Sequence, residues 1–181
     1  MVYRIDMKTF KQHILEKLKV SVRNTTKHTL FPETKDELRQ MIKYEISKNG
    51  NECSLNHIDV STITDMSGLF YGSDFNGDIS DWDVSNVEDM KVMFSGSKFN
   101  GDISEWDVSS VKDMTGMFKE SKFNGDISNW DVSNVENMER MFARSEFNGN
   151  ISNWDVSSVT NMSYMFDHSP LENNPPKWYI E

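Results

Sequence analysis

Residues 75–98 read FNGDISDWDVSNVEDMKVMFSGSK, and residues 99–122, 123–146 and 147–170 repeat this phrase without one insertion or deletion. The part that all four copies share is FNGxISxWDVSxVxxMxxMFxxSx, and each copy begins where the previous copy ends. A fixed period of this length is typical of proteins in which each structural unit packs only against its neighbours. The sequence therefore predicts an elongated repeat protein.

The register of the repeat continues beyond the four full phrases. Trp178 lies one full period after Trp154, the last of the four repeated tryptophans, and Ile58 lies one full period before Trp82, the first of them. Residues 58–74 therefore form a variant unit with a smaller apolar residue at the tryptophan position. We expect about five coils of 24 residues, with atypical units at both ends.

A short strand is predicted in the middle of each phrase. Trp82 and Val84 alternate with Asp81, Asp83 and Ser85. Alternation of apolar and polar residues is typical of a strand with one buried face, because successive side chains of a strand point to opposite sides. The apolar pair is expected to point inward and the Asp and Ser residues outward.

A short helix is predicted directly after this strand. Ser85 is a suitable N-cap, and Val87, Met90, Met93 and Phe94 follow at the spacing of one helical face. A strand and a short helix in every coil predict an α/β repeat solenoid of the leucine-rich-repeat type, with parallel strands along one side. The core is expected to contain the repeated aromatic residues Trp82, Trp106, Trp130, Trp154, Phe94, Phe118, Phe142 and Phe166.

Two further helices are predicted before the repeats. Apolar residues within residues 7–20 recur at helical spacing, with lysines between them. Thr34 and Glu37 have the spacing of a capping box, and Asn49-Gly50 is a suitable helix stop, so a second helix is expected over residues 35–48. Its apolar stripe is expected to cover the exposed end of the repeat core.

The chain is accordingly divided into two parts. Residues 1–50 are predicted to form a helical N-terminal region and cap, and residues 51–181 the leucine-rich-repeat-like solenoid with a C-terminal cap. Pro175-Pro176 interrupts the repeat near its end, because proline cannot donate a backbone hydrogen bond.

The repeated phrase carries a resemblance to a known family. FNGDISNWDVSNVENMERMF at residues 123–142 and NPPKWY at residues 174–179 resemble the repeats of BspA-like bacterial surface proteins, a branch of the leucine-rich-repeat superfamily. The similarity extends over residues 34–181. It implies a leucine-rich-repeat-like fold, and it implies a surface or secreted protein that adheres to host matrix proteins.

Charge is distributed unevenly along the chain. The net charge is −10, but residues 1–50 carry 11 Lys/Arg and 6 Asp/Glu, whereas residues 51–181 carry 8 and 23. An acidic repeat surface repels a phosphate backbone, so nucleic acid is not expected as a partner. A basic protein surface is the complementary partner for such a repeat.

Composition also bounds the location and the chemistry. Cys53 is the single cysteine, so a disulfide within the chain is excluded, and no paired Cys/His spacing predicts a zinc site. The N-terminal sequence has no apolar core of signal-peptide length, and no apolar run is long enough for membrane insertion. As written, the chain is expected to be cytoplasmic; a missing natural N-terminus or non-classical export would place it at the cell surface or outside. The oligomeric state stays open.

The repeat is expected to stack carboxylates in rows on the strand side. One row contains Asp59, Asp83, Asp107, Asp131 and Asp155, and a second contains Asp78, Asp102, Asp126 and Asn150. Local hydrogen bonds from the nearby Ser residues would offset the repulsion, which is the interpretation we favour. The alternative is a calcium ion held between carboxylates, with Asp83, Asp107 and Asp131 as candidate ligands.

Catalysis and sugar binding are not expected. The four histidines occupy no repeated position, the repeated serines are N-caps by context, and no cofactor motif is present. A row of tryptophans can stack on sugar rings when exposed, but the alternation with valine favours a core position here.

The sequence thus predicts a non-enzymatic protein–protein interaction module with an acidic binding face. Glu105, Asn129 and Asn153 vary at one position of this face, and we include them with the first Asp row as candidate binding residues. The alternative, taken from the family resemblance, is a bacterial surface adhesin for host matrix or cell-surface ligands, stabilised by calcium.

Overall fold

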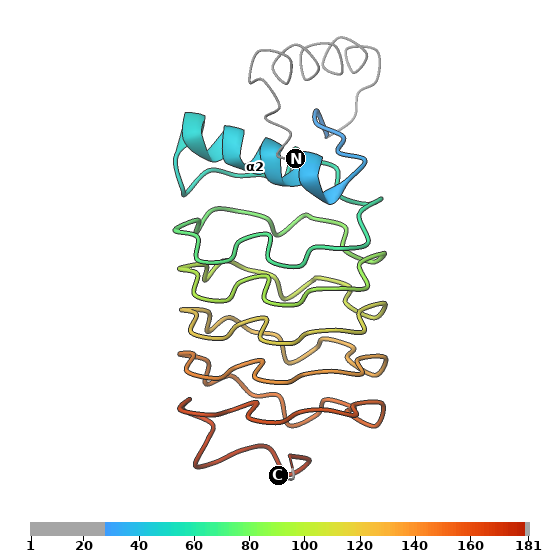
Figure 1. Ribbon diagram of the computed structural model, residues 1–181, viewed down its shortest axis with the longest axis vertical. Helices are drawn as coiled ribbons and strands as arrows, with labels where there is room; N and C mark the ends of the chain where they lie inside the picture. The colour runs from blue at the N-terminus through green and yellow to red at the C-terminus, as the bar shows by residue number, and fades with distance from the viewer. Residues whose placement is uncertain (1–27, 180–181) are drawn as a thin grey trace, which may run out of the picture.

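The computed structural model describes residues 28–179, so the helix predicted within residues 7–20 lies outside the described residues. Irregular coils lie one on another along the long axis of the molecule, in the order of the sequence (Figure 1). Helix α2 lies across the N-terminal end of this stack. The repeat therefore folds into a linear array in which each coil touches the coil before it and the coil after it.

Helix α2, Lys35–Asn49, confirms the helix predicted over residues 35–48. The hydroxyl of Thr34 accepts a hydrogen bond of 3.2 Å from the Glu37 N–H, as an N-cap should. At the other end Gly50 has a φ of 87° and donates its N–H to the Ile46 carbonyl at 2.8 Å. Three apolar residues of the helix, Leu38, Met41 and Ile42, are buried against the first coil.

The predicted α/β solenoid of leucine-rich-repeat type, with a strand and a helix in every coil, is wrong. Among residues 28–179, α2 is the one helix, and no strand or sheet is formed. The coils are joined by isolated parallel bridges, which connect residues 65, 89, 113, 137 and 161 in succession. The bridges lie in the part of the phrase where a helix was expected.

We call this joining segment the rung; it comprises residues 65–73, 89–97, 113–121, 137–145 and 161–169. Alternate residues of one rung donate their N–H groups to carbonyls of the next. Met90 donates to Asp113 at 2.9 Å and Val92 to Thr115 at 2.8 Å, and two further bonds follow in the same junction. The same four bonds recur at all four junctions between rungs.

The rung is built from tight turns instead of helix. The N–H of Met93 donates to the Met90 carbonyl at 3.1 Å, and the N–H of Ser97 to the Phe94 carbonyl at 3.1 Å. Two positions of each rung have positive φ, between 49° and 66°. They are occupied by Gly68, Gly72, Val92, Gly96, Gly116, Glu120, Arg140, Arg144, Tyr164 and His168.

The helical spacing misled the prediction for a physical reason. Successive turns return Met90, Met93 and Phe94 to the inside, as a helix would, and all three are buried. The turns leave every second N–H free to bond the neighbouring coil, whereas a helix would use these groups within its own coil. Bonds between coils are available only after the coils stack.

The tryptophan side of the coil is held together differently. Residues 79–87 make no backbone–backbone bond to the equivalent residues of the neighbouring coils. The Trp130 indole N–H instead donates to the Ile103 carbonyl at 3.0 Å, and the other repeated tryptophans do the same. Ring centroids are 6.4 Å apart for Trp82 and Trp106, but 5.6 Å for Phe94 and Phe118. The coils are therefore more widely spaced on the tryptophan side.

The aromatic residues expected in the core lie there. Trp82, Trp106, Trp130 and Trp154 are 4–5 % exposed, and Phe94, Phe118, Phe142 and Phe166 are at most 1 % exposed. At the C-terminal end Trp178 stacks on Trp154 with centroids 6.5 Å apart, and Tyr179 lies edge-on to Phe166 at 4.9 Å. These two residues cover the last coil, as α2 covers the first.

Replacement of Val92 by glycine is expected to stabilise the fold. A β-branched residue at a φ of 49° is strained, because its Cβ approaches the backbone, and glycine removes that contact. We expect Val92→Gly to raise the free energy of unfolding by about 1 kcal/mol. Urea denaturation measures the change, and Val92→Ala, which keeps a Cβ at the same φ, should gain less. Equal effects of the two variants would contradict the strain.

Candidate functional site

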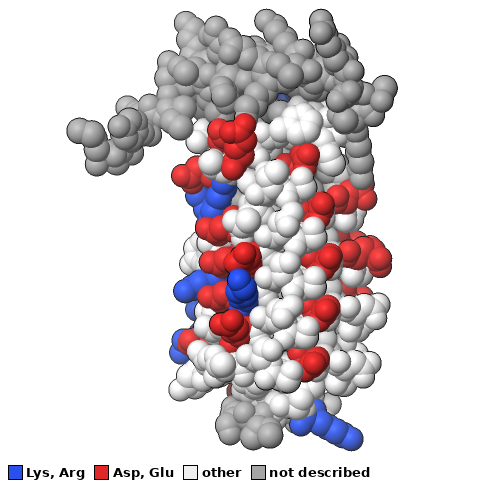
Figure 2. All heavy atoms as spheres, turned by 90° about the vertical axis from the view of Figure 1, so that its right-hand side faces the viewer, with Lys and Arg blue, Asp and Glu red and all other residues white. Residues whose placement is uncertain are grey.

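The acidic face comprises residues 54–63, 78–87, 102–111, 126–135 and 150–159, the same stretch of each coil. These stretches contain ten Asp or Glu residues and no Lys or Arg. Figure 2 shows one side of the molecule, on which acidic side chains form rows along the stack and Lys or Arg side chains lie beside one of these rows. The carboxylates of the acidic face are Asp59, Asp78, Asp81, Asp83, Asp102, Glu105, Asp107, Asp126, Asp131 and Asp155.

The first Asp row is shaped by the Ser two residues later. Oδ1 of Asp107 accepts hydrogen bonds from the N–H of Ser109 at 3.1 Å and from its hydroxyl at 2.6 Å. Asp83 and Asp131 make the same pair of bonds, and so does Asp59 with Ser61. The predicted local hydrogen bonding is confirmed. The backbone N–H groups used here are among those that a regular strand would have paired with its neighbour.

These hydrogen bonds keep the face ionised. The hydroxyl and N–H of Ser109 lower the pKa of Asp107, because they stabilise its carboxylate. Ser104 lowers the pKa of Asp102 in the same way, against smaller opposing effects of burial and of the negative charges on Asp126 and Asp78. The serine two residues further on also lowers the pKa of Asp126 and of Asp155. At neutral pH these groups are anions.

Several acidic residues outside this face have basic neighbours. Lys98 lies 2.8 Å from Asp74, and Lys112 lies 2.9 Å from Glu88. Further ion pairs join Lys119 to Glu120, Lys122 to Glu146 and Arg140 to Glu139. These five ion pairs lie outside the acidic face. The five stretches of the acidic face contain no Lys or Arg, and the His28 imidazole lies 3.8 Å from Asp59 at the N-terminal end of the face.

The remaining predicted site residues lie on this face as expected from their register. Glu105, Asn129 and Asn153 are exposed at one position of successive coils, next to the exposed Asp107, Asp131 and Asp155. The tryptophans between them are buried, which removes the sugar-stacking interpretation.

Sequence reasoning missed two arrangements near the ends of the stack. Lys35 of α2 lies 2.8 Å from the carboxylate of Asp65 and also bonds the Ser67 hydroxyl, which fixes the cap to the first rung. At the other end, ligand-type atoms of Asp167, His168 and Glu172 lie within 4.8 Å of one another. The three residues depart from the repeat, and a comparison of the phrases would have marked them.

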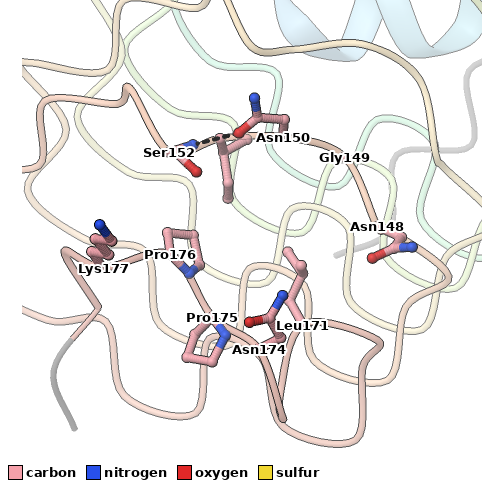
Figure 3. A pocket seen from close by; sticks show the side chains of 10 residues that line it. Asn148, Gly149, Asn150, Ser152, Leu171, Asn174, Pro175, Pro176 and Lys177 are labelled. Carbon is pink, nitrogen blue, oxygen red and sulfur yellow. Dashed lines mark hydrogen bonds between the residues drawn. The ribbon is translucent and has the colours of Figure 1, made fainter.

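A polar cavity of about 320 Å³ lies between the last coil and residues 171–179, which we call the closing segment. Asn148, Asn150 and Ser152 line one wall, with Pro175-Pro176 and Lys177 opposite (Figure 3). The N–H of Ser152 donates to Asn150 Oδ1 at 3.1 Å within it. The cavity arises where the two prolines replace the next copy of the phrase.

No helix among residues 28–179 has the length and apolar character needed to cross a membrane.

Comparison with known proteins gives one family. The model of the family described as "Mycoplasma protein of unknown function, DUF285" matches residues 36–144 and 119–180. The matches overlap and together include the cap helix, the coils and the closing segment. No curated protein and no solved structure matches the chain. The chain therefore belongs to the family of Mycoplasma proteins of unknown function DUF285.

Proposed function

We propose that the chain is a non-enzymatic protein-binding module whose acidic face engages a basic partner protein. The observation that carries the proposal is the contrast between the two sides of the coil. Ion pairs such as Lys98–Asp74 and Lys112–Glu88 lie outside the acidic face, whereas the face has ten carboxylates and no Lys or Arg. Like charges in a row repel one another, and a basic partner would neutralise them.

The spacing of the face supports an extended basic segment as the partner. Trp106, which precedes Asp107, stacks 6.4 Å from the equivalent ring of the coil before. Every second residue of an extended chain advances by about 6.6–6.8 Å. Lys or Arg at alternate positions of such a segment would therefore face successive carboxylates of the Asp row.

Neutralising two carboxylates of the row tests the proposal. Asn keeps the local turn, as the Ser152 N–H bond to Asn150 Oδ1 at 3.1 Å shows, so Asp107→Asn with Asp131→Asn should fold normally. With a seven-residue Lys-Ser alternating peptide as probe, we expect affinity at low salt to fall about three- to tenfold. Isothermal titration calorimetry measures the change.

A matched pair on the rung gives the control. Asp89→Asn with Asp113→Asn removes the same charge at a position where the chain already carries Asn137 and Asn161. This pair should leave the affinity nearly unchanged. Equal weakening by both pairs of substitutions would show that the affinity depends on the net charge of the chain and not on the acidic face. Unchanged affinity with the first pair would show that the acidic face is not the binding site.

A second function, that of a surface adhesin, is proposed from the similarity to BspA-like repeats. Its carboxylate rows, with Asp83, Asp107 and Asp131 as candidate ligands, would then hold calcium. Protease treatment of intact source cells should remove the protein while a cytosolic control protein survives. Survival of both proteins would count against display, and a melting temperature indifferent to calcium and chelator would remove the metal.

A further inference from the structure

The hydrogen bonds between rungs all run in one direction. Between the last two rungs the N–H of Met138 donates to Asn161 at 2.8 Å, and the N–H of Phe142 donates to Met165 at 2.9 Å. Arg140 and Arg144 donate to the same rung. In these four-bond junctions each rung therefore presents acceptors toward the N-terminal end of the stack and donors toward the C-terminal end.

The last rung, residues 161–169, consequently ends in a row of donors. Within residues 28–179 no acceptor lies at the N–H groups of Met162, Tyr164, Phe166 and His168. Most carbonyls of this rung are used: those of Met162, Tyr164 and Phe166 accept local N–H bonds, and four others accept from the preceding rung. A partner that covers this rung would shield these donors from water, and leaving them unpaired would then be costly. A partner with acceptors at the same spacing would instead form four hydrogen bonds with them.

The closing segment covers the core beside this rung but does not supply the missing acceptors. The indole N–H of Trp178 donates to the Ile151 carbonyl at 2.9 Å, which continues the tryptophan row. The N–H groups of Glu172 and Asn174 donate to carbonyls only three residues earlier in the chain, those of Ser169 and Leu171. The core is thus closed while the rung stays open.

The turn geometry of the rung restricts what can bind there. Two residues four apart have positive φ in every rung, which places alternate N–H and C=O groups on opposite sides over a short, curled path. An ordinary extended strand has a longer path and would not keep this register. Two copies of the last rung cannot pair either, because donors would face donors.

We propose that the last rung docks one further rung of the same turn geometry, supplied by a second polypeptide of this repeat type. The contact would continue the junction that already occurs four times in the chain, with the four free N–H groups bonded to carbonyls of the incoming segment. The incoming segment must accept positive φ at two positions four residues apart. The site is separate from the acidic face and independent of its function.

A pair of peptides tests this geometry on the full chain. The probe copies residues 65–74, DMSGLFYGSD, whose Gly68 and Gly72 both have a φ of 61°. One version carries D-Ala at both glycine positions and the other carries L-Ala. D-residues favour positive φ and L-residues disfavour it, so we expect the D-Ala peptide to bind at least about tenfold more tightly.

Amide NMR of the ¹⁵N-labelled chain locates the contact. The amides of Met162, Tyr164, Phe166 and His168 should shift and exchange more slowly with solvent when the D-Ala peptide is added. Equal affinity of the two peptides would overturn the proposal, and so would shifts confined to other residues. Slow exchange of the four amides in the free chain would also overturn it, because the rung would then be closed already.

Discussion

Trp130→Ala is expected to lower the free energy of unfolding by about 3–5 kcal/mol. Trp130 lies in the middle of the stack with 4 % of its surface exposed, and its centroid is 6.3 Å from that of Phe118. Its removal leaves a cavity between two coils and leaves the Ile103 carbonyl without its donor at 3.0 Å. Because each coil is stabilised by its neighbours, the loss weakens the contacts on both sides.

Two variants separate the contributions to this loss. Trp130→Phe keeps an aromatic ring but removes the indole donor, so about 1–3 kcal/mol should be lost. Trp178→Ala removes the same side chain at the partly exposed end of the row, where about 1–2 kcal/mol is expected. Urea denaturation followed by circular dichroism measures all three. A loss at Trp178 as large as that at Trp130 would show that the core does not derive its stability from stacking on both sides.

Gly77→Ala is expected to be the most damaging glycine substitution, with a loss of about 3 kcal/mol. A Cβ at Gly77 would lie 2.0 Å from the carbonyl oxygen of Cys53 and 2.7 Å from the ring of Phe75. The backbone cannot move away easily, because Asn76 and Asp78 on either side donate hydrogen bonds of 2.9 and 3.2 Å to the preceding coil. The added methyl group must therefore separate the first two coils.

Gly125→Ala is the matched control, since Gly125 has the same place in its phrase. There the nearest carbonyl, that of Gly101, is 3.6 Å from the added Cβ, and the Phe123 ring is 2.9 Å away. The ring contact is common to both sites, so the difference between the variants isolates the clash with the Cys53 carbonyl. We expect Gly125→Ala to lose about 1 kcal/mol. Equal thermal and urea stability of the two variants would contradict the close approach at Gly77.

The two proposed binding surfaces can be tested independently. The acidic face acts through charge, so its binding should weaken as salt rises. The last rung acts through backbone hydrogen bonds, so its binding should depend little on salt and strongly on the chirality of the peptide. Asp107→Asn with Asp131→Asn should therefore leave the rung peptide unaffected, whereas Lys-Ser peptide binding should be insensitive to occupancy of the rung.

Much of the architecture could be predicted from the sequence because each position of the repeat occurs several times, and the residues that are kept in every copy can be recognised. The fixed repeat period predicted the stacking, Thr34 and Glu37 predicted the start of α2, and the Trp-x-Val alternation predicted that Trp130 is buried. The Asp-x-Ser spacing also predicted the local hydrogen bonds of the candidate site. These features depend on residues close in sequence or on which residues are apolar.

The kind of backbone in each coil could not be predicted in this way. Met90, Met93 and Phe94 have the spacing of a helix, but successive turns bring the same three residues inward. Likewise, Asp83 and Ser85 have the alternation of a strand, but their side chain–backbone bond replaces a bond to the next coil. A hydrophobic pattern reports which side chains are buried, and more than one backbone conformation satisfies it.

The sequence by itself determined the repeat, the cap helix, the buried aromatic rows and the acidic face, since all follow from residue type and local spacing. Only the tertiary structure decided where the coils bond to one another. The N–H of Val92 finds its acceptor at Thr115, in the next coil, and this bond cannot form until the coils are stacked. Those contacts between coils select turns over helix, place non-glycine residues such as Val92 at positive φ, and leave the last rung open.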